Sequence, residues 1–213
     1  MKLLAFESSA KAAGTALLSD GCLLAEYMQN SGQTHSRTLM ELAKNMLSGC
    51  DLTPQDIDAV AVAAGPGSFT GVRIGVAAAR ALALAWKLPL HGYTAPSLIA
   101  AMAARDHGEG PIAVTITGGH GELFWQCFAA DGRSATSAIA STPIATLATQ
   151  LDVTTIYGTG AEALVTARGH GTAINLYPDA ADHGLIAGLP SLPPTPIYGR
   201  GADAQTMAER AAS

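Results

Sequence analysis

The amino-acid sequence predicts an α/β protein, and three observations support that fold class. Apolar runs at residues 14–18 and 22–27 flank a Ser-Asp-Gly turn and predict a β-hairpin, since Asp and Gly tolerate the positive φ of a tight turn. A third apolar run, at residues 57–63, has the composition of a strand covered on both faces. It leads through a glycine-rich loop into a long apolar helix, which is typical of an α/β crossover.

The first half of the chain predicts five strands and three helices. The strands are expected at residues 2–6, 14–18, 22–27, 57–63 and 88–93. The helices are expected at residues 36–48, about 70–86, and 96–104. Leu39, Ala43, Met46 and Leu47 form one apolar stripe on the first helix. Gly49 is expected to end that helix in the left-handed conformation.

This order, an antiparallel start followed by α/β crossovers, is by analogy typical of ribonuclease-H-like domains. Two such domains form the halves of actin-like proteins and sugar kinases. The polar, glycine-containing residues 106–110 interrupt the pattern, and the remainder repeats it in shorter and less regular form. We therefore expect an N-terminal lobe at residues 1–105 and a smaller, degenerate lobe at residues 106–213.

Composition and charge exclude several classes of protein. The 213 residues are 48% hydrophobic and 14% charged, which supplies a sizeable core. The three cysteines are isolated, so neither a disulfide framework nor a zinc site is expected. The net charge is −5 without a basic cluster, so any contact with RNA should come mostly from another protein. The best apolar stretch, Val72–Trp86, contains two arginines, so we expect a cytoplasmic protein without a membrane span.

Residues 65–75, GPGSFTGVRIG, lie where nucleotide-binding proteins hold phosphate. Val72 stands where a Walker A loop requires Lys, and Thr70 stands where the dinucleotide fingerprint requires Gly. Two interpretations remain open. The loop is a sharp turn whose Ser68 or Thr70 caps the next helix, or it is a generic anion site made of helix N-terminal amides and those hydroxyls.

The helix after this loop carries a ridge of small residues. Gly71, Gly75, Ala79 and Ala83 recur every four residues, while Arg73 and Arg80 lie seven apart on one face. A glycine inside a helix costs about 1 kcal/mol relative to alanine, so close approach of another element should offset it. The ridge packs tightly on the protein's own sheet, or it docks on a partner helix together with helix 36–48.

The catalytic signals are weak. His120, near Glu122, is a lone metal candidate, but it is more simply a turn histidine. A kinase of this superfamily needs an acidic residue on the first strand and glycine-rich phosphate turns in both halves. Glu7 fills the first role at best, and Gly158-Thr-Gly160 only weakly resembles an adenosine turn. We therefore expect a protein that is not an enzyme and has no metal or cofactor of its own.

The sequence resembles the TsaB (YeaZ) family. LLAFESS with TALLSDG resembles the opening of that family, and THSRTLM resembles the start of its first helix. GPGSFTGVRIG matches its most specific signature almost letter for letter, and IYGTGAE and PIYGR fit a weaker C-terminal pattern. The resemblance is dense to about residue 100 and looser after it. Glu7 departs from the usual Asp, and residues 116–125 depart from the family pattern.

The resemblance implies a two-lobed, non-catalytic subunit that supports TsaD, together with TsaE. The assembly transfers a threonylcarbamoyl group to the adenosine beside the anticodon of ANN-decoding tRNAs. ATP and metal would belong to TsaD and TsaE, and tRNA would be contacted through the complex. In the family, the helices that correspond to 36–48 and 70–86 contact TsaD, or form a homodimer when TsaD is absent.

These implications predict two groups of site residues. The helix docking surface would comprise Leu39, Ala43, Met46, Gly71, Arg73, Gly75, Ala79 and Ala83. A vestigial ligand loop would comprise Glu7, Gly65, Gly67, Ser68 and Thr70. The alternative function is a small carbohydrate or acyl kinase of the same superfamily, which ATP-dependent turnover by the isolated protein would favour.

Overall fold

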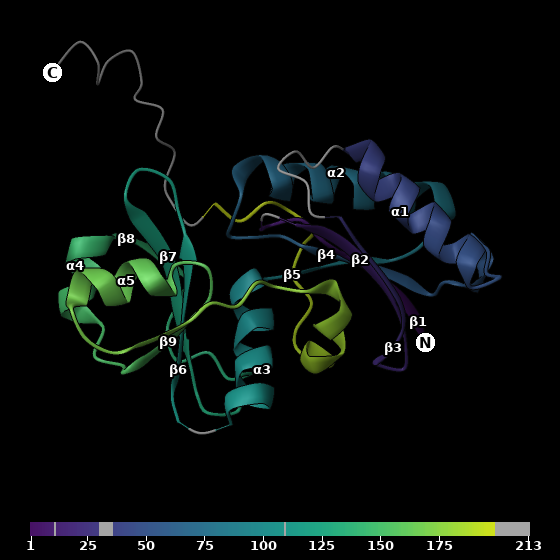
Figure 1. Cartoon of the computed structure of the whole chain (residues 1–213). Coiled ribbons are helices and arrows are strands. Elements are labelled where there is room, and N and C mark those ends of the chain that lie inside the picture. Colours follow the sequence, from purple (N-terminus) through teal and green to yellow (C-terminus); the bar gives the residue numbers. More distant parts are fainter. Residues whose placement is uncertain (11, 30–35, 109, 199–213) are drawn as a thin grey trace, which may run out of the picture.

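The computed structural model describes residues 1–10, 12–29, 36–108 and 110–198, and it contains two five-stranded sheets side by side (Figure 1). The first sheet comprises β1 (Lys2–Glu7), β2 (Ala13–Ser19), β3 (Cys22–Gln29), β4 (Ala59–Ala63) and β5 (Leu90–Tyr93). Its strand order is β3-β2-β1-β4-β5. β1, β2 and β3 are antiparallel neighbours, whereas β4 and β5 run parallel to β1. The predicted hairpin turn is confirmed, with φ of 50° at Asp20 and 82° at Gly21.

The second sheet repeats the topology of the first. It comprises β6 (Ile112–Thr117), β7 (Glu122–Phe128), β8 (Ala140–Pro143), β9 (Thr155–Tyr157) and β10 (Thr172–Ile174), in the order β8-β7-β6-β9-β10. β6, β7 and β8 are antiparallel, and β9 and β10 run parallel to β6. The predicted pair of ribonuclease-H-like lobes is therefore confirmed. The sequence analysis missed β8 and β10, which are only four and three residues long.

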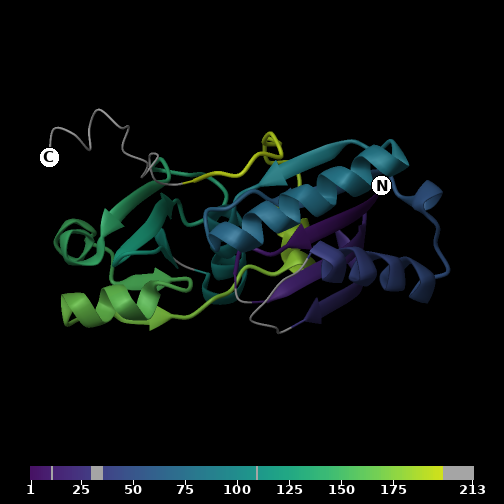
Figure 2. The same cartoon turned by 90° about the horizontal axis from the view of Figure 1, so that it is seen from above.

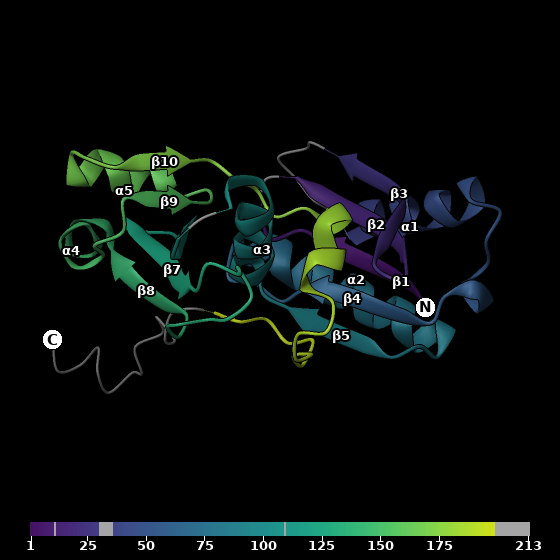
Figure 3. The ribbon, with the colours of Figure 1, turned by 90° about the horizontal axis from the view of Figure 1, so that it is seen from below.

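Helices cover both sheets and separate them. α1 (Ser36–Gly49) and α2 (Phe69–Trp86) lie on one face of the first sheet (Figure 2). α4 (Ile144–Gln150) and α5 (Ala161–Arg168) pack against the second sheet. α3 (Ala95–His107) lies between the sheets (Figure 3): Leu98 and Met102 pack in the core beneath the first sheet, while Ile99 and Ala103 pack on the second.

Strand alternation divides the core of the first lobe. Leu4 and Phe6 of β1 point toward α1 and α2, whereas Leu3 and Ala5 point toward α3. Gly49 is the last residue of α1, and the expectation that it takes the left-handed conformation is wrong: the positive φ, 54°, lies at Asp51. The Cys50 amide still donates to the carbonyls of Met46 and Leu47, so the helical hydrogen bonds continue past Gly49. The chain therefore reverses at Asp51, two positions later.

The chain returns to the first lobe after β10. A short 3-10 helix, η2 (Ala180–Ile186), packs beneath β1, β2 and β3 and against α3. Leu192 then bridges to Gly92 of β5, and the Ile197 amide donates to the Ala64 carbonyl at 2.7 Å. The division into lobes at residues 105 and 106 stays a prediction.

Among the described residues, α2 alone has the length and apolar composition of a membrane-spanning helix, with a mean hydropathy of 1.3. However, 44% of this helix is buried inside the protein, where Val72 and Val76 pack in the core of the first lobe. Its apolar composition is thus that of a core helix.

Candidate functional site

The glycine-rich loop between β4 and α2 is seated on the turn that follows β1. The Ser68 amide donates to the Ser9 carbonyl at 2.7 Å, and a side chain at Gly67 would collide with that same carbonyl. Ser68 Oγ accepts a hydrogen bond from the Gly71 amide at 3.2 Å, which confirms the capping interpretation for Ser68. Thr70 is exposed beside it. Gly65, with φ of 98°, supplies the left-handed bend that begins the loop.

Glu7 joins this loop through Ser9. Its carboxylate accepts hydrogen bonds from the Ser9 amide at 2.7 Å and from Ser9 Oγ at 2.6 Å. The Tyr93 hydroxyl lies 3.2 Å from Glu7 Oε2 and 2.9 Å from the Phe6 carbonyl oxygen. Glu7 is only 2% exposed, so the structure brings it together with the predicted loop but turns its carboxylate inward.

Burial dominates the protonation of Glu7. Desolvation raises the pKa of Glu7 to about 7, although hydrogen bonds from Ser9 and Tyr93 act in the opposite direction. The nearby carboxylate of Asp179 raises this pKa further. The Tyr93 hydroxyl has one proton and two acceptors within reach, the Phe6 carbonyl and the Glu7 carboxyl group, so it can donate fully to only one of them at a time. The site therefore holds a buried carboxyl group that is about half protonated near pH 7.

The small-residue ridge of α2 packs on this same turn and not on a partner. A side chain at Gly71 would collide with the Ser8 carbonyl, and one at Gly75 would collide with Ser8 Oγ. Ser8 Oγ donates to the Gly71 carbonyl at 2.9 Å. The expectation that Gly71 and Gly75 face a partner helix is therefore wrong, because the chain's own Ser8 occupies the space that they leave.

The remaining apolar members of the predicted docking surface are also core residues. Leu39, Ala43, Met46 and Ala79 are fully buried, and Ala83 is 5% exposed. All five pack in one cluster with β1, β2 and β4. Their periodicity marks the inner faces of α1 and α2, since both helices must bury one stripe against the sheet. These residues are thus not available to a partner in this fold.

The opposite face of α2 is open. Arg73 and Arg80 are exposed, as is Leu84, whose side chain is 82% exposed. On α1, Met40 is exposed as well. Of the predicted docking residues, Arg73 therefore lies on a surface that another protein can reach.

A cluster of Phe69, Arg73 and Tyr198 marks the start of this open face. The Arg73 guanidinium carbon lies 3.7 Å from the Phe69 ring centroid, and Arg73 Nε donates to the Tyr198 hydroxyl at 2.7 Å. The two aromatic rings are 57% and 47% exposed, respectively. Arg80 donates to Thr195 at 3.3 Å, so the C-terminal segment follows the helix. The sequence analysis missed Phe69 and Tyr198, although both lie in motifs that it quoted, GPGSFTG and PIYGR.

The second lobe holds a counterpart of the glycine-rich loop. Gly158 and Gly160 connect β9 to α5, and the Gly160 amide donates to the Thr115 carbonyl of β6 at 3.0 Å. A side chain at Gly158 would collide with that carbonyl. Thr159 is tied to Thr117, whose amide donates to Thr159 Oγ1 at 3.1 Å. These contacts give the glycines a packing role.

No group of three or more potential metal ligands occurs within the described ranges. His120 lies in the β6–β7 turn with φ of 60° and is exposed, in agreement with the turn interpretation. Glu122 accepts a hydrogen bond from Ser141 at 2.7 Å. The structure thus does not assemble a metal centre around these two residues.

Comparison with known sequences identifies related proteins. The family model described as "TsaD: tRNA N6-adenosine threonylcarbamoyltransferase" matches residues 24–162. The tRNA threonylcarbamoyladenosine biosynthesis protein TsaB of Bacillus subtilis is 35% identical over 124 residues, which are 58% of this chain and 53% of that protein. The Escherichia coli protein of the same name is 33% identical over 125 residues, or 59% and 54% of the two chains. The match thus spans about half the length of these curated relatives.

Solved structures resemble the chain over nearly its whole length. A Pseudomonas aeruginosa protein described as similar to peptidase YEAZ superposes with a TM-score of 0.80 at 26% identity, covering 93% of this chain and 99% of the other. YeaZ from the same organism gives 0.78 at 26% identity, covering 92% and 99%. The ethanolamine utilization protein EutJ of Carboxydothermus hydrogenoformans, at 13% identity and a TM-score of 0.50, shares the fold alone.

Proposed function

Because this chain belongs to the family of the TsaD model and, within it, to the TsaB (YeaZ) proteins, we propose that it is a subunit of the assembly that makes threonylcarbamoyladenosine in tRNA. The observation that carries the proposal is the joint match of sequence and fold. The family model spans 139 of the 213 residues, from 24 to 162, and the superposition on YeaZ extends over 92% of the chain. The proposed role is non-catalytic support of a TsaD-like subunit.

The outer face of α1 and α2 is the proposed docking surface. It offers Leu84, which is 82% exposed, the exposed arginines Arg73 and Arg80, and the exposed ring of Phe69 beside Arg73. Arginine and aromatic residues are enriched among the residues that dominate binding at protein interfaces. The surface replaces the buried ridge that the sequence analysis put forward. A second copy of the chain would use the same face when the partner is absent.

The chemistry of the assembly would reside in the partners. TsaD-like and TsaE-like proteins would supply ATP and metal, and this chain would have no cofactor of its own. The net charge of −5 supports contact with tRNA only through the complex. The assembly would act in the cytoplasm. The alternative function, a small-molecule kinase, would require a carboxylate open to a ligand. Glu7 is instead 2% exposed and bonded to Ser9.

Leu84→Asp tests the docking surface. The purified chain should bind the TsaD-like protein of the same organism, and this variant should weaken the binding at least about tenfold, since a charge would be buried at an apolar contact. Titration calorimetry measures the affinity, and thermal melting shows that the fold is intact. Leu24→Asp, at an exposed leucine of β3, is the matched control and should bind normally.

One result would contradict the proposed function, and another would contradict only the proposed surface. If the chain does not bind the TsaD-like protein at all, the proposed function is wrong. If both variants bind as the original chain does, the function stands but the surface lies elsewhere.

A further inference from the structure

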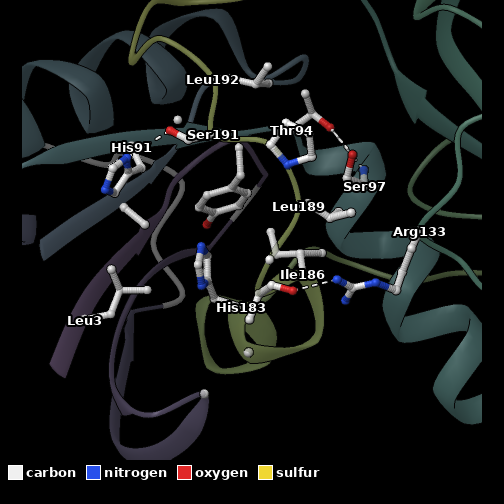
Figure 4. A pocket seen from close by; sticks show the side chains of 18 of the residues that line it. Leu3, His91, Thr94, Ser97, Arg133, His183, Ile186, Leu189, Ser191 and Leu192 are labelled. Carbon is white, nitrogen blue, oxygen red and sulfur yellow. Dashed lines mark hydrogen bonds between the residues drawn. The ribbon is translucent and has the colours of Figure 1, made fainter. Parts of the chain in front are cut away.

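A cavity of about 690 Å³ lies on the face of the first sheet that is turned away from α1 and α2 (Figure 4). Three parts of the chain enclose it. Leu3 and Tyr93 belong to the first sheet, Phe128 ends β7 of the second lobe, and residues 183–192, here called the roof, close the remaining side. Ligand sites typically measure roughly 300–1,000 Å³ and form between domains.

Short side chains on the sheet make room for the cavity. Strand alternation places Ala5, Ala16, Ala59, Ala61 and Ala63 in the core cluster beneath the sheet. Ala61, in the middle of β4, lines the cavity itself. An alanine side chain extends only one carbon beyond the backbone. The space between these alanines and the roof therefore stays unfilled at the distance at which the roof lies from the strands.

Close backbone contacts fix the roof at both ends. Gly184 is seated against the Gly21 carbonyl so tightly that a side chain there would collide with it. A side chain at Gly92 would lie 2.7 Å from the Pro193 carbonyl oxygen. From the second lobe, Arg133 donates to the carbonyls of Leu185 and Ala187. The cavity is therefore held open by the fold and is not a gap beneath a loose segment.

The described lining carries no carboxylate, and its two cationic groups are engaged. The Arg133 guanidinium is bonded to the two roof carbonyls, and the N-terminal ammonium group of Met1 pairs with Asp20 at 2.5 Å. Burial lowers the pKa of His183 to about 4, so its imidazole is neutral at physiological pH, and the rings of His183 and Tyr93 form a T-shaped pair. A cationic ligand would lose its hydration without gaining a counter-charge, and an anionic ligand would have to compete with the two roof carbonyls for the Arg133 guanidinium, so this lining favours an uncharged ligand.

One pair of polar side chains in the lining, Thr94 and Ser97, can form a hydrogen bond with such a ligand. The hydroxyls of Thr94 and Ser97 lie 2.6 Å apart, and Thr94 Oγ1 also accepts from the Ser97 amide at 3.2 Å. Two hydroxyls carry two protons, and the bond between them uses one. The other proton can be donated to a carbonyl or similar acceptor. The second polar pair, His91 and Ser191, is bonded at 2.9 Å across the mouth.

We propose that this cavity is a binding site for a small uncharged molecule with a largely apolar surface and a hydrogen-bond acceptor, held between the lobes and oriented by the Thr94–Ser97 pair. The site is separate from the outer face of α2, which lies on the opposite side of the same sheet. The proposal therefore goes beyond the proposed function, and its test does not require the TsaD-like protein.

Prodan, a neutral naphthalene ketone whose emission shifts to the blue in apolar surroundings, is the probe. Titration of the full chain should show saturable binding with a blue shift, and the anionic dye anilinonaphthalene sulfonate should not compete. Ala187→Trp and Ala135→Trp place a large ring in the lining at exposed positions and should weaken prodan binding at least about tenfold. Ala85→Trp, on the exposed face of α2, is the matched control and should not change it.

Ser97→Ala tests the polar contact. Thr94 Oγ1 can still cap α3 in this variant. Its own proton is freed from Ser97, but Thr94 is only 6% exposed, so the more exposed of the two donors is lost with the hydroxyl of Ser97. Prodan affinity should fall about threefold to tenfold, and the thermal melt should stay unchanged.

Absence of saturable binding to the original chain would overturn the proposal. Equal binding by the original chain and both cavity variants would overturn it too, since the dye would then bind elsewhere. Should a tryptophan variant fail to fold, Ser97→Ala decides: unchanged affinity in that variant contradicts the assigned orientation.

Discussion

At the scale of single residues, Glu7 and His183 make contributions to the stability of the fold that change with pH in opposite directions. Burial raises the pKa of Glu7 to about 7 and lowers the pKa of His183 to about 4. Between pH 4.5 and 7, folded Glu7 holds a proton that the unfolded chain releases, so its contribution to stability falls as pH rises. Between pH 4 and 6.5, the unfolded chain protonates His183 and the folded chain does not, so that contribution rises with pH. The two contributions therefore offset each other over most of this range.

Glu7→Gln should uncouple the two contributions. The amide can keep the bonds to Ser9 and Tyr93 but cannot titrate. The free energy of unfolding of the original chain minus that of the variant should decrease by about 3 kcal/mol from pH 4.5 to pH 7.5. Urea unfolding of both proteins at several pH values measures this difference. The contribution of His183 is the same in both proteins and therefore cancels. A difference that is flat, or that rises with pH, would contradict the protonated state of buried Glu7.

At the scale of elements, α2 is a helix fitted to the turn after β1. Four of its inward residues are Gly71, Gly75, Ala79 and Ala83, and Ser8 fills the space beside the two glycines. Glycine in a helix costs about 1 kcal/mol relative to alanine, and here the close approach of Ser8 and its hydrogen bond to the Gly71 carbonyl offset this cost. The ridge therefore serves internal packing, and the proposed docking surface for another protein lies on the other side of the helix.

Gly71→Ala should destabilise the fold although alanine is the better helix former. Its methyl group would collide with the Ser8 carbonyl, and such overpacking costs about 1–3 kcal/mol, more than the roughly 1 kcal/mol gained in helix propensity. Thermal melting measures the effect. Gly119→Ala is the matched control, since no heavy atom lies within 4 Å of the added carbon, and it should melt normally. A higher melting temperature for Gly71→Ala would show that the turn after β1 yields easily.

At the scale of the whole molecule, two copies of one topology are tied together by α3 and by the returning C-terminal segment. The ties are asymmetric, because η2 and the roof extend the second lobe back under the first sheet (Figure 3). Arg133 is the described side chain of the second lobe that donates to two roof carbonyls. Its planar guanidinium, with several N–H donors, is suited to such a double contact.

Arg133→Ala should loosen the roof. Loss of two charged hydrogen bonds should speed amide hydrogen exchange at Ala187 and Leu189 at least about tenfold, with little change in α1 or α2. Arg168→Ala is the matched control, since Arg168 also donates to two carbonyls, those of Leu151 and Val153, but within the second lobe. Equal acceleration of the roof in both variants would show that Arg133 does not tie it down.

Local patterns in the sequence were sufficient for the order of most elements and for part of the site. The Ser-Asp-Gly turn, the apolar run before GPGSFTG and a hydroxyl cap on the next helix depend on residues within a few positions of one another, so local sequence predicts them. The choice of Ser68 over Thr70 as the cap came from the structure. Short strands such as Thr172–Ile174 carry too few residues to show a period and were missed.

The sequence by itself determined most of the elements and the family to which the chain belongs, because turn chemistry, apolar period and a specific motif act over short distances. Only the tertiary structure decided what each face meets. From the sequence, a ridge of small residues could pack on a partner helix as well as on Ser8. The contact that forms in the structure joins Ser8 and Gly71, which are 63 positions apart. The cavity has the same origin: alanines on the strands and a roof more than a hundred residues away enclose it only when the chain folds back.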